Sequence, residues 1–68
     1  MADDLKPGDR VSWSSHGSRA HGRVVRRLTE ETDVGGRVAK ATSEEPQYLV
    51  ETDDGKQAAH HPSALRKL

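Results

Sequence analysis

The chain of 68 residues is long enough for one small domain, and its lack of cysteine excludes a disulfide framework and a cysteine-ligated zinc site. Apolar residues make up only 31% of it, and no apolar run approaches the roughly 20 residues that a membrane-spanning helix needs. Eleven Lys and Arg residues balance eleven Asp and Glu residues, so the excess positive charge typical of nucleic-acid-binding proteins is absent. The acidic N-terminus lacks the features of a secretory signal, and we expect a cytoplasmic protein.

Alternation of polar and apolar residues predicts the first two strands. After the turn signal Pro7-Gly8-Asp9, residues 10–14 alternate so that Val11 and Trp13 would face a core. A loop over residues 15–18 leads to a second strand over residues 21–29. If Val24 and Leu28 point inward there, Arg23, Val25 and Arg27 point outward and Arg26 falls on the inner side. A bulge near Gly22 or at the Val24-Val25 pair, or a strand end that curls toward solvent, would bring Arg26 back to solvent.

Three further strands are predicted over residues 37–42, 47–52 and 57–61. A polar connection over residues 30–36 precedes the first of these and ends in a turn at Gly35-Gly36. The Asp54-Gly55 pair is a strong hairpin signal between the last two strands. Residues 62–65 are expected to form a single helical turn, after which Leu65 and Leu68 would return to the core.

Five short strands with turns between them indicate an all-β fold, and a chain of this length cannot build two full sheets. We therefore expect a small five-stranded barrel with a C-terminal helical turn. Residues 1–7 would form a flexible N-terminal segment and residues 8–68 the single barrel. The expected core contains apolar residues from every strand, namely Val11, Trp13, Val24, Leu28, Val38, Tyr48, Val50, Ala58 and Leu65.

Four motifs together resemble a known family. They are the opening Gly8-Asp9-Arg10-Val11-Ser12-Trp13, then residues 21–25, then residues 44–50 with the sequence EEPQYLV, and the ending at residues 61–68. The family is the Tudor-like domain named for a fungal hypervirulence-associated protein, whose bacterial members are mostly stand-alone small proteins of unknown function. The resemblance covers about residues 8–68. It implies an SH3-like, Tudor-like barrel, and it implies no particular activity.

A Tudor-like fold raises the question of methylated Lys or Arg, which such domains hold in a cage of several aromatic rings. This chain has two aromatic residues of the Phe, Trp and Tyr type, Trp13 and Tyr48. Both are expected in the core, with the Tyr48 hydroxyl at its rim. The sequence therefore disfavours a reader of methylated side chains.

The residue types used in metal sites and in catalysis occur without the spacing that those sites need. His60 and His61 are adjacent and would point to opposite faces of a strand, whereas His16 and His21 flank a loop without further ligands. Neither a nucleophile-elbow motif nor a phosphate-binding glycine-rich loop is present. We expect no metal, no cofactor and no enzymatic activity.

Binding remains the expected role, through one of two surfaces. Arg23 and Arg27 would share the outer face of the second strand, with Arg37 across from them and Arg19 leaning in from the loop; such a stripe binds phosphates through guanidinium contacts. Without aromatic residues for base stacking, nucleic-acid binding there would be weak and indifferent to sequence. We favour instead a monomeric module that docks a protein or peptide at a sheet edge or in a groove beside Trp13 and Tyr48. The candidate binding residues are Arg19, Arg23, Arg27, Arg37, Trp13 and Tyr48.

Overall fold

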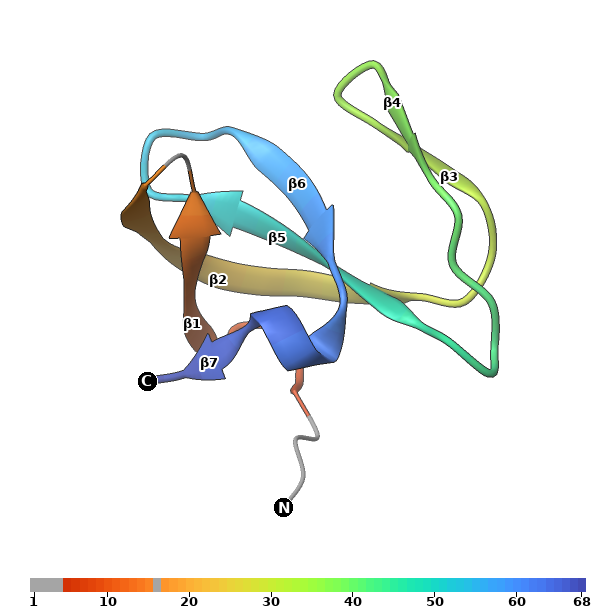
Figure 1. The fold of residues 1–68 in the computed structure, drawn as a ribbon, viewed down its shortest axis with the longest axis horizontal. Coiled ribbons are helices and arrows are strands. Elements are labelled where there is room, and N and C mark those ends of the chain that lie inside the picture. The colour runs from red at the N-terminus through yellow and green to blue at the C-terminus, as the bar shows by residue number, and fades with distance from the viewer. Residues whose placement is uncertain (1–4, 16) are drawn as a thin grey trace.

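The computed structural model describes residues 5–15 and 17–68. Within these residues the strands are β1 (Arg10–Ser15), β2 (Ser18–Leu28), β3 (Thr32–Val34), β4 (Arg37–Ala39), β5 (Gln47–Thr52), β6 (Gln57–His60) and β7 (Arg66–Lys67), and a 3-10 turn, η1 (Pro62–Ala64), precedes the last strand. Five strands form one antiparallel sheet in the order β6-β5-β2-β1-β7, while β3 and β4 pair separately (Figure 1). The expected all-β fold with one C-terminal helical turn is confirmed.

The five-stranded sheet curls around its core, and η1 joins its two edge strands, β6 and β7. No β6–β7 ladder is present among the described residues, so the barrel stays open between these two strands. The predicted hairpin at Asp54-Gly55 is confirmed between β5 and β6, where Gly55 takes the left-handed backbone conformation with a φ of 91°.

The hairpin β3–β4 differs from the sequence-based expectation. The predicted strand over residues 37–42 is shorter, and it pairs with β3 in a segment that we expected to be a connection. Gly35 and Gly36 both have positive φ angles and make the tight turn between the two strands. The fifth strand of the main sheet is instead β7, whose pairing with β1 leaves the hairpin projecting beside the sheet (Figure 1).

A β-bulge interrupts β2 at Val25. Val24 lies opposite Val50 of β5, but Arg26 lies opposite Leu49, so one extra residue is accommodated on the β2 side. The bulge leaves Arg26 exposed, as its charge requires, and Val25 half-buried. Of the three alternatives that the sequence left open for Arg26, the structure contains the bulge at the Val24-Val25 pair.

The core is divided into two clusters. The first lies inside the curled sheet and contains Leu5, Val11, Trp13, Val24, Tyr48 and Val50, with Ala20, Ala58 and Leu65 packed against it. The second lies under the hairpin and contains Leu28, Val34, Ala39, Ala41 and Leu49. Val38 was expected in the core but is 55% exposed, because the β3–β4 pairing turns its neighbour Ala39 inward instead.

The two ends of the chain behave differently from each other. Residues 1–4 of the expected flexible segment lie outside the described residues, but Leu5 is only 8% exposed and packs into the first cluster. The Lys6 amide donates a hydrogen bond to the Asp9 carboxylate and holds the segment close to β1. At the other end Leu68 is 62% exposed rather than returned to the core, whereas Leu65 packs as expected.

Candidate functional site

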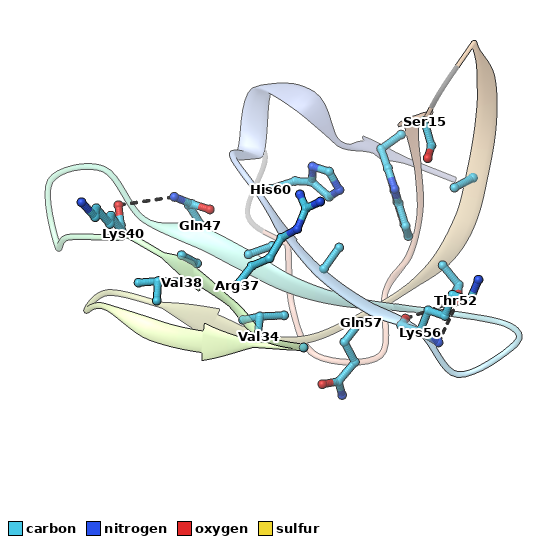
Figure 2. Close-up of a pocket in the computed structure, with 16 residues that line it drawn as sticks. Ser15, Val34, Arg37, Val38, Lys40, Gln47, Thr52, Lys56, Gln57 and His60 are labelled. Atoms are coloured by element: carbon cyan, nitrogen blue, oxygen red, sulfur yellow. Dashed lines mark hydrogen bonds between the residues drawn. The ribbon is translucent and has the colours of Figure 1, made fainter.

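A groove of about 720 Å³ separates the five-stranded sheet from the β3–β4 hairpin (Figure 2). The sheet side includes Trp13, Ala20, and every residue of β6. The opposite side comes from the hairpin and the residue after it. The lining of the groove includes Trp13, Arg37, Val38, Lys40, Lys56, Ala58 and His60.

Trp13 belongs to the core and also borders this groove. Its side chain is 4% exposed, and its ring lies with its centroid 5.4 Å from that of His60 at an interplanar angle of 39°. Tyr48 is buried in the same cluster and does not line the groove. Of the two aromatic residues predicted for the site, the structure therefore brings only Trp13 to it.

His60 presents a mostly neutral ring to the groove at pH 7. Burial lowers the pKa of His60 below its ordinary value of 6.5, and Coulombic repulsion from neighbouring His61 lowers it further. The half-buried imidazole thus extends the aromatic and apolar surface that begins at Trp13.

The charged side chains that line the groove are all basic. Arg37 and Lys40 come from the hairpin side, and Lys56 comes from the turn between β5 and β6. The Arg37 side chain points from β4 toward His60 (Figure 2). No Asp or Glu is among the described lining residues. Although the chain as a whole has no formal net charge, the charged side chains described along this groove carry only positive charge.

A hydrogen bond ties the hairpin to the sheet at one end of the groove. The Gln47 side-chain amide donates to the Lys40 carbonyl over 3.4 Å (Figure 2). The second core cluster packs beneath, joining Val34 and Ala39 of the hairpin to Leu28 and Leu49 of the sheet. The groove is therefore held open by packed side chains on both sides.

The four predicted arginines do not share one face. Arg23 lies opposite Glu51 and Arg27 opposite Tyr48, and these two positions on β5 project to opposite faces of the sheet. The bulge at Val25 causes this change, because one extra residue reverses the alternation. Arg37 lies on the separate hairpin, so the prediction that it lies across from Arg23 and Arg27 is wrong.

Arg19 occupies a separate position on β2. It lies opposite Ser14 of β1, and its Nη2 donates a hydrogen bond of 2.8 Å to the Ser12 Oγ. Ser12 is the buried polar residue of the described chain, with 2% of its surface exposed. Arg19 is therefore held against β1, away from both Arg37 and the groove.

Sequence reasoning missed Val38, Lys40, Lys56 and His60 as groove residues. A signal for the hairpin was present, since Gly35-Gly36 stands between two short alternating runs and a two-residue glycine turn is typical of a β-hairpin. No sequence signal places Lys56 and His60 opposite that hairpin, because this depends on how the two sheets pack.

In residues 5–15 and 17–68 no group of three or more His, Asp or Glu side chains is placed to hold a metal ion, and His16 lies outside the described residues. The helical content of the described chain is one short turn, which is far too short to cross a bilayer.

Comparison with known proteins gives one finding. The family model described as "Hypervirulence associated proteins TUDOR domain" matches residues 8–65, which is all but the first seven and last three residues. No curated protein and no solved structure matches the chain significantly.

Proposed function

The chain belongs to the family of Tudor domains of hypervirulence-associated proteins, and from this premise we propose that it is a small non-enzymatic module that docks an acidic, extended protein segment in the groove between β6 and the β3–β4 hairpin. The observation that carries the proposal is the lining of the groove. Three basic side chains and several apolar ones line it, without an acidic residue among those described.

Charge complementarity favours an acidic partner. Arg37, Lys40 and Lys56 all line one groove of about 720 Å³, with Lys40 and Lys56 at opposite ends of it (Figure 2), so successive carboxylates of an extended segment each meet a cation. At physiological ionic strength charges are screened over about 8 Å, so a segment in the groove interacts mainly with the cations that line it, and charges elsewhere on the chain act weakly. Acidic segments are thereby attracted and basic ones repelled.

The backbone favours an extended partner. β6 is an edge strand of the five-stranded sheet, and all four of its residues line the groove. An extended segment adds to such an edge through main-chain hydrogen bonds, while alternate side chains enter the pockets beside it. Val38 is 55% exposed and stands opposite as an apolar contact for those side chains. The proposed ligand therefore alternates acidic and apolar residues.

The proposal is tested by titrating the protein with a short blocked peptide of alternating Glu and Val. Trp13 is the single tryptophan of the chain and borders the groove, so its fluorescence reports binding. The double variant Arg37→Glu with Lys40→Glu is expected to bind this peptide at least about tenfold more weakly. A peptide of alternating Lys and Val should not bind the native protein.

The matched control reverses the same number of charges outside the groove. Arg23→Glu with Arg27→Glu alters two exposed arginines that do not line the groove, and peptide binding should be unchanged. Equal loss of affinity in both double variants would contradict the proposal. Binding of a short single-stranded DNA that disappears in the Arg23 and Arg27 variant would instead favour nucleic-acid binding at these two arginines.

A further inference from the structure

A second hollow lies on the outer face of the sheet, away from the groove. It measures about 370 Å³ and is lined by Ser14, Arg19, Ser63, Ala64, Leu65 and Arg66. It shares none of its described lining residues with the groove between β6 and the hairpin. We call it the Arg19–Arg66 hollow.

Strand register brings the two arginines to one face of β1. Arg66 of β7 lies opposite Ser12, and Arg19 of β2 lies opposite Ser14. Ser12 and Ser14 are two residues apart on β1, so both point to the same side of the sheet. Arg19 and Arg66 therefore flank β1 from its two neighbouring strands, with the hollow between them.

One of the two guanidinium groups is already oriented. Arg19 donates from Nη2 to the buried Ser12 Oγ over 2.8 Å, which fixes the head of this long side chain over β1. The remaining N–H groups of Arg19 stay free of any hydrogen bond within the described chain. A guanidinium held in this way loses less rotamer freedom when it binds an anion than a freely moving one does.

The charge of the hollow is not neutralised by the described protein. The two ion pairs of residues 5–15 and 17–68 join Arg10 to Asp53 and Lys67 to Asp9, and neither involves Arg19 or Arg66. No acidic side chain is among the described lining residues. Two like charges that share a hollow repel each other, and a bound anion removes that repulsion.

The donors fit a phosphate group better than a carboxylate. Each guanidinium offers parallel N–H groups that match two oxygens of one anion, and the Ser14 and Ser63 hydroxyls add two further donors. A carboxylate presents two oxygens on one plane, whereas a phosphate dianion presents three acceptor oxygens in different directions. We propose that the Arg19–Arg66 hollow is a binding site for one phosphate dianion, either free inorganic phosphate or the terminal phosphate of a phosphomonoester.

The test is an amide-resolved NMR titration of the full chain with three probes: inorganic phosphate, phenyl phosphate and dimethyl phosphate, each at constant ionic strength. Saturating shifts at Ser14, Ala64 and Leu65 are expected with the first two. The diester carries one negative charge and should bind at least about fivefold more weakly. Tighter binding of phenyl phosphate than of inorganic phosphate identifies a phosphomonoester as the ligand, and the reverse order identifies free phosphate.

Variants separate this site from general charge effects. Arg66→Gln removes one exposed guanidinium without touching the Ser12 contact and should weaken phosphate binding at least about tenfold. Arg66→Lys keeps the charge but loses the paired donors, and it should recover only part of the affinity. Arg26→Gln removes an exposed arginine elsewhere on β2 and should change nothing.

Three results would overturn the proposal: equal shifts with sodium chloride, unchanged binding in Arg66→Gln, or equal loss in Arg26→Gln. The outcome is independent of the acidic-segment proposal, because that ligand is expected to shift residues of β4 and β6 instead.

Discussion

Replacement of Gly22 by alanine is expected to damage the sheet at its centre. Gly22 lies on β2, opposite Val11 of β1 and Thr52 of β5, and it is buried. A Cβ at this position would stand 2.1 Å from the Glu51 carbonyl oxygen and 2.8 Å from its carbon, whereas ordinary contact begins near 3.4 Å. Both neighbouring atoms belong to the backbone, so no rotamer change relieves the overlap. Only separation of β2 from β5 makes room.

The magnitude follows from that geometry. Overpacking a core costs about 1–3 kcal/mol and occasionally more, and the clash with a strand backbone places Gly22→Ala at about 3 kcal/mol or above. For a domain of 60–100 residues each kcal/mol lowers the melting temperature by roughly 4–8 °C, so we expect a fall of about 12–24 °C. Urea unfolding followed by Trp13 fluorescence measures the free energy of unfolding directly.

The matched control is Gly55→Ala in the β5–β6 turn. Gly55 has a φ of 91° and no atom within 4 Å of an added Cβ, so its replacement adds only the backbone penalty of about 1–2 kcal/mol. A free energy of unfolding for Gly22→Ala that equals or exceeds that of Gly55→Ala would refute the reasoning from close strand approach.

Two further predictions concern the groove and its hairpin. Folding stability should fall as the pH drops below about 6.5, because the unfolded chain protonates His60 near its ordinary pKa, whereas burial and, to a smaller extent, His61 keep the pKa of His60 lower in the folded state. His60→Gln should flatten this pH dependence, and His21→Gln, at an exposed position, should not. Urea unfolding at several pH values measures the free energy of unfolding, and the same pH dependence in both variants would contradict the prediction. Leu28→Ala should lower the free energy of unfolding by about 2–5 kcal/mol, because Leu28 is 1% exposed beneath the hairpin. The exposed Val38 is the control, and Val38→Ala should change the free energy of unfolding by less than about 0.5 kcal/mol. A lower melting temperature for Val38→Ala than for Leu28→Ala would mean that the hairpin packs differently.

Local patterning was sufficient to predict the strands that bury Trp13, Val24 and Val50. In β1 the apolar residues recur with the period of two that a half-buried strand requires, whereas Tyr48, Leu49 and Val50 of β5 form a continuous apolar run that is buried on both faces of the sheet. The bulge at Val25 was also predictable, since a strictly alternating strand would have buried Arg26. These features depend on residues close together in the sequence.

Long-range pairing was not predictable from the same patterns. The segment 37–42 alternates weakly, and nothing in it distinguishes a strand of the main sheet from one arm of a separate hairpin. The very short β7 occupies the fifth position of the main sheet, which residues 37–42 were expected to take. Its pairing with β1 depends on where η1 directs the chain, and no local pattern encodes this. The exposure of Val38 and the burial of Ala39 both follow from that one difference.

In the candidate site, too, the features that depend on long-range pairing were not predictable from the sequence. Simple alternation predicts one face for Arg23 and Arg27, but the extra residue of the bulge at Val25 places them on opposite faces. Ser12 lies between the core residues Val11 and Trp13 and so faces the outer side of the sheet, yet it is buried because Arg19 covers it from the adjacent strand. The groove itself depends on the packing of the hairpin against the sheet, which no short motif encodes.

The central claim, that the groove between β6 and the hairpin docks an acidic extended segment, is tested most directly by an amide-resolved NMR titration with the peptide of alternating Glu and Val. The account predicts saturating shifts at Val38, Ala58, Ala59 and His60, on the two sides of the groove. Shifts that are absent, or that gather away from these residues, would contradict it.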